Sequence, residues 1–325
     1  MRISKKAAAP AADHQPASPK SSPAAEPAGG TQPATVASAV EAATIVAKPR
    51  VSRRLTRPAD DCDRDGLLKG KKALVFGVAN DHSIAWGIAK ALYDQGAEVG
   101  FSSMASLIKR RVRPLAASIG STFVEGADVR DDEEIRKVFE HWNKRHGDLD
   151  ILVHAVAYAE REDLDGHFTD ISRSGFHTAF DISVYSLIAM AREGRPYMKP
   201  GSSIMTMTYY AAEKVVPNYN VMGVAKAALE ATTKYLAADL GPSGIRVNAI
   251  SAGPVRTLSA HGIAGFRTMY GGFKDVTPLR SHISIEDVGN TAVYLASPLS
   301  SQTTGEVIYV DGGFNILALP VAPEE

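Results

Sequence analysis

The chain has 325 residues, of which 45% are hydrophobic and 22% are charged, a composition that suffices for one large domain or one domain with a tail. Its 36 basic and 36 acidic side chains cancel, so no overall charge attracts the protein to nucleic acid or to a membrane. The sequence has no apolar run of about 18 residues, which a membrane span requires, and no Cys/His set with metal-site spacing. Its single cysteine, Cys62, excludes an internal disulfide.

Residues 1–67 are dominated by Ala, Pro, Ser and Thr and contain almost no aromatic residues. Such a segment cannot bury enough apolar surface to offset chain entropy, so we predict a disordered extension. It lacks the apolar stretch of a secretory signal, which favours a cytoplasmic protein. Its Ser, Lys and Arg leave import into an organelle as the alternative. We expect one domain over 68–320, followed by a short tail over 321–325.

From residue 71 onward, short apolar strands alternate with helices. Strands are predicted at 71–79, 97–103, 121–129, 149–158, 202–210, 245–255 and 305–314. Helices are predicted at 83–96, 107–120, 131–147, 174–193, 221–240 and 285–297, with a bend or break at Pro114. This alternation predicts an α/β fold, a Rossmann-like doubly wound parallel sheet in a single domain. Ligands of such a sheet bind at the carboxyl ends of its strands.

The loop after the first strand runs from Gly77 to Gly87 and has the features of a phosphate-binding turn. Gly77 lets the chain turn sharply, and the helix that follows directs its positive N-terminus at the loop. We expect the small residues Ala79, Ser83 and Gly87 to let the backbone approach a pyrophosphate and the helix pack close to the sheet. The loop is not G-x-G-x-x-G, so the nucleotide interpretation depends on its position in the first βα unit.

Two further positions bear on the nucleotide. Asp128 ends the third strand, where its carboxylate is suited to accept a hydrogen bond from an adenine amino group or to cap the following helix. The second strand ends at Met104 without the acidic residue that usually marks NAD, so that rule does not choose between NAD and NADP. The basic run Lys109–Arg111 is suited to a 2′-phosphate, or it forms a solvated helix face.

Tyr219 and Lys226 are the strongest candidates for chemistry. A spacing of seven residues is about two helical turns, so both side chains leave one face if the helix already includes Tyr219. A phenol has a pKa of about 10, and we expect the nearby ammonium to lower it. The alternative is an interfacial Tyr and a solvated Lys that share a face by chance.

Together these residues resemble the short-chain dehydrogenase/reductase superfamily. The Gly-x5-Ser-x-Ala-x-Gly loop in VANDHSIAWGIA and the Tyr-x6-Lys spacing in PNYNVMGVAKAALEA narrow the resemblance, since the common superfamily spacing is Tyr-x3-Lys. The sequence is similar to the enoyl-acyl-carrier-protein reductases of bacterial type II fatty acid synthesis over residues 68–318. The resemblance implies NADH as the cofactor, with NADPH as the alternative, an acyl carrier protein as the partner, and a homotetramer.

The resemblance also implies roles for individual residues. Tyr209 and Tyr219 match the two active-site tyrosines, and Lys226 matches the lysine that holds the nicotinamide ribose. Further cofactor contacts are implied at Gly77, Ser83, Ile84, Met104, Asp128, Val129, Val156, Ala157, Val255 and Thr257. Further substrate contacts are implied at Ala159, Ile263 and Phe266.

The sequence departs from the family pattern at three positions. Ala157 stands where Gly is common and adds a methyl group beside the cofactor, and Tyr158 stands where Phe is common. Met104 replaces a polar residue and removes a hydrogen bond to the adenine side. None of these changes removes a catalytic group.

Residues 258–273 form an apolar, Gly-rich stretch, which we interpret as a lid over an acyl chain or as an ordinary amphipathic helix. His261 is expected to be a surface residue. Carrier proteins are acidic, so basic residues near the mouth are candidates for docking, although each also fits plain surface charge. These candidates are Arg256, Arg267, Lys274 and Arg280.

The resemblance implies reduction of a trans-2-enoyl thioester, in which Tyr219 donates a hydrogen bond to the thioester oxygen as it becomes negative. Tyr209 is implied as a second contributor. One alternative is a reductase of the same fold that acts on a ketone or an alcohol. A cofactor-binding regulatory protein without turnover is a further alternative, against which Tyr219 and Lys226 argue.

Overall fold

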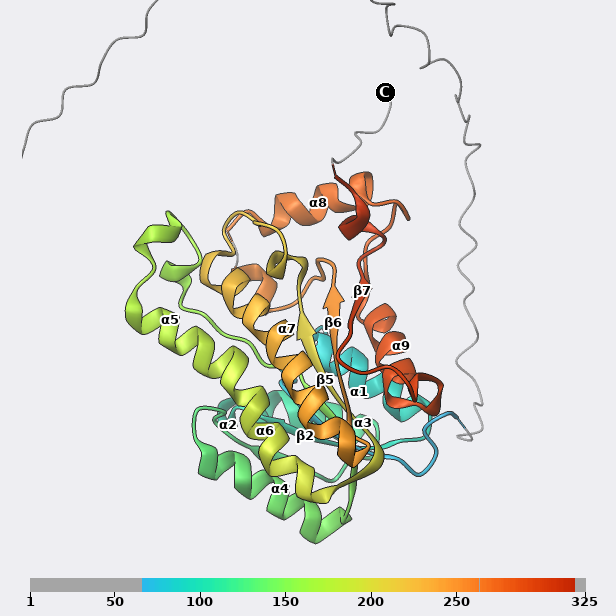
Figure 1. Ribbon diagram of the computed structural model, residues 1–325. Coiled ribbons are helices and arrows are strands. Elements are labelled where there is room, and N and C mark those ends of the chain that lie inside the picture. The colour runs from blue at the N-terminus through green and yellow to red at the C-terminus, as the bar shows by residue number, and fades with distance from the viewer. Residues whose placement is uncertain (1–65, 263, 319–325) are drawn as a thin grey trace, which may run out of the picture. The chain divides into compact units, whose positions relative to one another are not determined.

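The computed structural model describes residues 66–262 and 264–318. Within them, seven parallel strands form one sheet in the order β3-β2-β1-β4-β5-β6-β7. The alternation in the sequence predicts such a parallel sheet, and Figure 1 shows it among the helices. The strands are β1 Lys72–Phe76, β2 Glu98–Ser103, β3 Val124–Gly126, β4 Leu149–His154, β5 Met198–Thr208, β6 Arg246–Ala252 and β7 Val307–Val310. Strand order reverses between β1 and β4, so their carboxyl ends form the crevice in which such sheets bind ligands.

Helices cover both faces of this sheet. They are α1 Ile84–Asp94, α2 Ala105–Leu107, α3 Arg113–Ser118, α4 Asp132–His146, α5 Arg173–Phe180, α6 Ser186–Gly194, α7 Asn220–Leu240, α8 Phe266–Val276 and α9 Ile285–Ala296. Two π-helical turns interrupt predicted helices, one at Ile108–Val112 and one at Asp181–Tyr185. Pro114 lies in the first turn of α3, where its missing N–H is tolerated, so the predicted break lies just before it. Among the described helices, none has the length and hydropathy of a membrane span.

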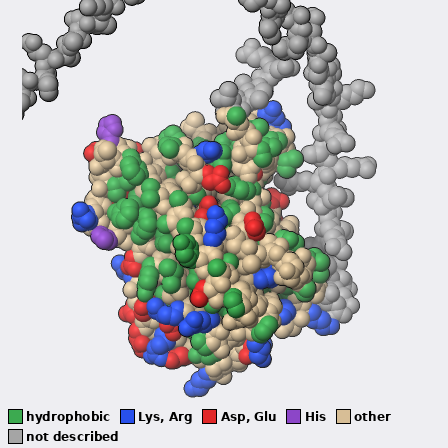
Figure 2. Space-filling model, in the orientation of Figure 1, with side chains coloured by type: hydrophobic (Ala, Val, Ile, Leu, Met, Phe, Trp, Pro, Cys, Tyr) green, Lys and Arg blue, Asp and Glu red, His purple; other side chains and the backbone are tan. Residues whose placement is uncertain are grey.

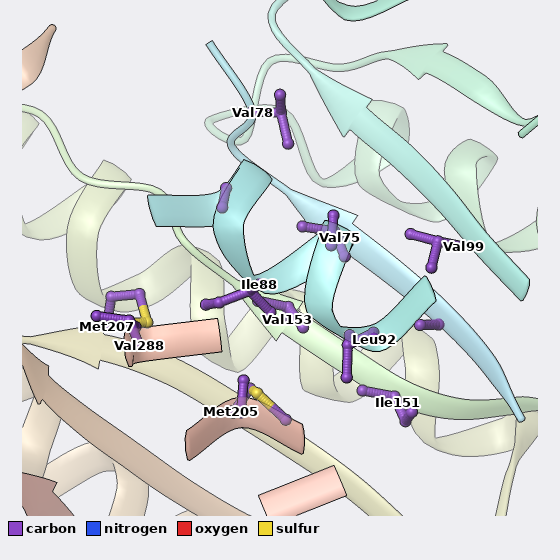
Figure 3. Packing of buried hydrophobic residues seen from close by; sticks show 14 of the residues in the cluster. Val75, Val78, Ile88, Leu92, Val99, Ile151, Val153, Met205, Met207 and Val288 are labelled. Atoms are coloured by element: carbon purple, nitrogen blue, oxygen red, sulfur yellow. The ribbon is translucent and has the colours of Figure 1, made fainter. Parts of the chain in front are cut away.

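Strand β1 shows why the sheet needs both layers. Ala73 and Val75 face a core cluster with α1 and α9, whereas Leu74 and Phe76 face a second cluster with α4, α6 and α7. Successive side chains of a strand point to opposite faces, so a strand buried on both faces becomes a continuous apolar run. Figure 3 shows the first cluster, in which α1 directs its apolar side chains at β1 and β4.

The sequence prediction extended several strands too far. The strand predicted over 149–158 ends at His154, and the one predicted over 71–79 ends at Phe76. The residues beyond these ends remain apolar but leave the sheet. They form the loops from which the candidate site is built.

Candidate active site

Gly77 joins the two loops at the crevice. Its φ of 99° favours glycine, and a Cβ built on it would lie 2.1 Å from the carbonyl oxygen of Ala155 and 3.3 Å from Val156. No side chain fits in that space, so the turn after β1 packs directly on the loop after β4. Gly77 and Val156, far apart in the sequence, therefore lie side by side.

The N-terminus of α1 has the chemistry of an anion site. Ser83 is its N-cap residue, but the hydroxyl donates to the carbonyl oxygen of Asn80 at 2.5 Å and does not cap the helix. The first turn, which includes Ile84, carries no acidic side chain. Free N–H groups and the helix dipole therefore leave this end positive.

Gly87 has a different role from the one predicted. A Cβ at this position would lie 2.5 Å from the carbonyl oxygen of Ile285 in α9. Gly289 of α9 packs in return against the backbone of Gly87. Gly87 therefore lets α1 approach α9, and the expectation that it brings the helix close to the sheet was wrong.

Asp128 and Val129, which the resemblance assigns to the adenine pocket, follow shortly after β3. The Asp128 carboxylate pairs with the Arg130 guanidinium at 2.5 Å, and this hydrogen bond lowers its pKa. The helix cap is Asp131, whose side chain accepts from the N–H groups of Glu133 and Glu134. The interpretation of Asp128 as the cap was therefore wrong. Met104, after β2, is 61% exposed.

Tyr209 and Tyr219 meet beyond the carboxyl end of β5. Their ring centroids lie 5.1 Å apart at an interplanar angle of 74°, an edge-to-face pair. Burial raises the pKa of Tyr219 above its ordinary value, and Tyr209 adds to the effect. The expectation that an ammonium lowers this pKa was wrong, because desolvation of the phenol dominates. Burial likewise raises the pKa of Tyr209 to about 12.

Lys226 is buried, with 5% of its surface exposed, so it is not a solvated lysine. Its Nζ donates to the carbonyl oxygen of Met207 in β5 at 2.7 Å. Burial lowers its pKa to about 8, although the nearby Glu230 acts in the opposite direction. Met207 is near the carboxyl end of β5, and Tyr209, which Tyr219 contacts, lies just beyond that end. Both Lys226 and Tyr219, the N-cap of α7, therefore face the carboxyl end of β5.

Helix α8 lies beside this pair, and residues 258–273 contain this helix with a short 3-10 turn before it, an arrangement that fits both a lid and an ordinary amphipathic helix. The Tyr209 hydroxyl lies 3.7 Å from Sδ of Met269, and Asn218 donates to the carbonyl oxygen of Ala264 at 3.0 Å. Phe266, at the start of α8, is buried. The predicted substrate residue Ile263 lies outside the described residues.

The loop after β6 contacts α8 through a cation–π interaction. The Arg256 guanidinium lies 4.5 Å from the centroid of the Tyr270 ring, whose stacked partner is His282 at 4.1 Å. In the same loop Val255 is buried, and the Thr257 hydroxyl accepts from the N–H of Ala260 at 3.1 Å. Helix α8 therefore joins the tyrosine pair to this loop.

Two buried polar side chains near the site were missed by the sequence reasoning. His154 ends β4 and lies 2.8 Å from both Thr206 and Ser186, and burial lowers its pKa to about 3. Ser183 lies in the second π-helical turn. The sequence did offer a signal for His154, because a histidine at the end of an apolar strand is unusual. It offered none for Ser183. Within residues 66–262 and 264–318, no three His, Cys, Asp or Glu side chains form a metal-binding group.

A family model described as enoyl-(acyl carrier protein) reductase matches residues 77–315. The chain belongs to this family. Enoyl-acyl-carrier-protein reductase (NADH) 1 of Rhizobium meliloti strain 1021 is 50% identical over 254 residues, 78% of this chain and 93% of the relative. The corresponding NADH reductase of Aquifex aeolicus is 49% identical over 261 residues, 80% of this chain and 97% of the relative.

Solved structures agree with this assignment. The Bacillus cereus enoyl-acyl carrier protein reductase, in complex with NADP+ and an indole naphthyridinone, has a TM-score of 0.77 and 49% identity, covering 78% of this chain and all of that one. The Aquifex aeolicus enzyme has a TM-score of 0.76 with the same identity and coverage.

Proposed function

We propose that this enoyl-acyl-carrier-protein reductase family member reduces a trans-2-enoyl thioester on an acyl carrier protein with NADH, the last step of the fatty acid elongation cycle. The observation that carries the proposal is the edge-to-face pair of Tyr209 and Tyr219 beside buried Lys226, beyond the carboxyl end of β5. The relatives named as NADH-dependent enoyl-acyl-carrier-protein reductases support the same substrate and cofactor.

The residues present fit a dinucleotide, because the uncapped N-terminus of α1 offers free N–H groups to a pyrophosphate. Gly77, Ser83 and Ile84 would hold that group, and Lys226 would hold the nicotinamide ribose. Met104, Asp128 and Val129 would surround adenine, whereas Val156, Ala157, Val255 and Thr257 would line the nicotinamide side. When bound, NADH supplies the hydride that adds to the β-carbon of the enoyl group.

Tyr219 acts on the thioester oxygen of the substrate, whereas the hydride adds to the β-carbon. Negative charge develops on the thioester oxygen as the enolate forms, and a fixed donor at that position lowers the barrier. Because burial raises the pKa of Tyr219, the phenol keeps its proton and donates a hydrogen bond. Tyr209 is the second donor, and the Lys226 ammonium makes the local potential positive. Phe266 and Ala159 would contact the acyl chain.

The carrier would dock at basic side chains near α8. Arg267 and Lys274 are exposed on α8 itself. Arg280 follows the helix and donates to the carbonyl oxygen of Asp275. The fourth candidate is Arg256, whose guanidinium lies over the Tyr270 ring.

The function is tested by mixing the purified protein with NADH and crotonyl thioester and following NADH absorbance. We expect oxidation of NADH that depends on the thioester, and none with a panel of ketones. Turnover on a ketone instead would favour the alternative reductase. Absence of any turnover would favour a regulatory protein.

We predict that NADH is preferred over NADPH by about tenfold or more in kcat/KM. The residues directly after β2, Met104, Ala105 and Ser106, carry no cation that could pair with a 2′-phosphate, and an unpaired phosphate forfeits charge-assisted hydrogen bonds. The basic run Lys109–Arg111 lies farther along, exposed on the first π-helical turn. Steady-state kinetics with each cofactor decide the matter. A preference of about tenfold for NADPH would mean that this run reaches the phosphate.

We also propose a homotetramer, supported by two separate apolar surfaces. One lies on α5, α6 and α7, where Phe176, Ile188 and Val224 are each 39% exposed; Figure 2 shows hydrophobic side chains gathered over α5. The other contains Tyr294 and Leu299, near the edge strand β7. Two self-complementary surfaces generate a closed tetramer, whereas one yields a dimer. Light scattering should show tetramers for the parent and dimers for Ile188→Glu; a monomeric parent would contradict the proposal.

A further inference from the structure

A buried side chain from another segment binds the backbone of the loop after β4 at Tyr158. Ser183 is fully buried, and its hydroxyl accepts from the N–H of Tyr158 at 3.1 Å and donates to the carbonyl oxygen of the same residue at 3.2 Å. The side chain of Tyr158 contributes little to anchoring, since it is 47% exposed and its hydroxyl donates to Glu160 within the same loop. Ser183 therefore fixes the backbone of Tyr158 from outside the loop.

The same hydroxyl lies against the helix that carries the tyrosine donor. Ser183 Oγ is 3.8 Å from Sδ of Met222, in the first turn of α7. The N–H of Met222 donates to the carbonyl oxygen of Tyr219 at 2.9 Å. Ser183 thus lies where the loop after β4 meets the first turn of α7.

The π-helical turn explains how a helix presents this hydroxyl. Residues Asp181–Tyr185 form the turn between α5 and α6, and Ser183 lies at its centre. An extra residue in a helical turn rotates the following side chains by about 100° relative to those before it. The wider turn therefore lets α5 and α6 each pack on the protein while Ser183 points at the loop.

We propose that Ser183 is a positioning residue, which holds the Ala157–Ala159 wall of the site at a set distance from Tyr219. This inference rests on the proposed function, in which that wall contacts the nicotinamide and the substrate. The hydroxyl replaces the pairing that the chain loses when it leaves the sheet after His154, because it satisfies both backbone groups of Tyr158. A looser wall would misplace the thioester relative to the Tyr219 hydroxyl, and small misplacements of reacting groups slow catalysis steeply.

The test compares Ser183→Ala with Ser203→Ala in the full chain. Ser203 is a matched control, since it is also fully buried, and its hydroxyl donates to the carbonyl oxygen of Leu295 in α9. Two quantities are measured for each variant: hydrogen exchange of the Tyr158 amide, and kcat and KM on crotonyl thioester. We expect Ser183→Ala alone to speed exchange about tenfold or more and to lower kcat/KM about tenfold to a hundredfold. Ser203→Ala should lower Tm without either effect.

A third variant, Ser183→Thr, keeps the hydroxyl and should restore slow exchange and most of kcat/KM. Unchanged Tyr158 exchange in Ser183→Ala would overturn the inference, as would kinetic constants that match those of Ser203→Ala. The exchange measurement needs no turnover. If the parent did not reduce enoyl thioesters, the proposed function would fail, whereas the contact between Ser183 and the loop would still be decided by exchange.

Discussion

Replacing Tyr219 with Phe should lower kcat on enoyl thioesters by about 10²- to 10³-fold, with little change in the Kd for NADH. The phenol hydroxyl is needed chiefly when charge develops on the thioester oxygen, so its loss affects the transition state more than the bound ground state. The ring itself is retained in Phe, and with it the edge-to-face contact with Tyr209. The measurement combines steady-state kinetics with a fluorescence titration of NADH.

Tyr235→Phe is the matched control for this variant. Tyr235 lies on the same helix, α7, and is 82% exposed, so the same loss of a hydroxyl there should leave kcat unchanged. A Tyr219→Phe enzyme as fast as the Tyr235→Phe enzyme would remove Tyr219 from the mechanism. A large rise in the Kd for NADH would instead assign the hydroxyl to the cofactor.

Replacing Lys226 with Met should have opposite effects on function and on stability. The ammonium is assigned to the nicotinamide ribose and to the positive local potential, so the variant should bind NADH more weakly and turn over more slowly. The cofactor-free protein, however, should become more stable at pH 7. Burial of the ammonium lowers its pKa from 10.5 to about 8, a difference equivalent to about 3 kcal/mol. The lost hydrogen bond to Met207 offsets about 1 kcal/mol of this gain.

The stability difference between the parent and Lys226→Met should depend on pH in a definite direction. The folded pKa of Lys226 lies below the unfolded one, so between about pH 8 and 10.5 the folded state binds fewer protons than the unfolded state. The free energy of unfolding of the parent therefore rises with pH in this window, and the advantage of Lys226→Met shrinks. Denaturant titrations at pH 7 and about pH 9.5 stay below the midpoint of the tyrosine titration, near pH 10, and the tyrosines are the same in both proteins. A stability difference that does not change with pH would contradict the burial of a charged Lys226.

The sequence alone determined the fold class and the family. Alternating apolar strands and amphipathic helices predict the layers because side-chain periodicity reflects which faces are buried, and this information is local. Gly77, which opens the first βα turn, and the Tyr219 to Lys226 spacing are local signals too. They point to the crevice between β1 and β4 and to Tyr219 and Lys226 as the candidates for chemistry. Strand ends were less well determined, as His154 shows, because apolar residues continue into the loop beyond the sheet.

The tertiary structure alone decided how these residues behave. Whether Asp128 caps a helix or pairs with Arg130 depends on local geometry that the composition leaves open. The packing of Gly87 on α9 joins segments about 200 residues apart in the chain. The pKa of Tyr219 rises because folding removes water from the phenol, and that desolvation depends on every neighbour at once. The contact of Ser183 with Tyr158 likewise arises only when a π-helical turn and a distant loop are brought together by the sheet.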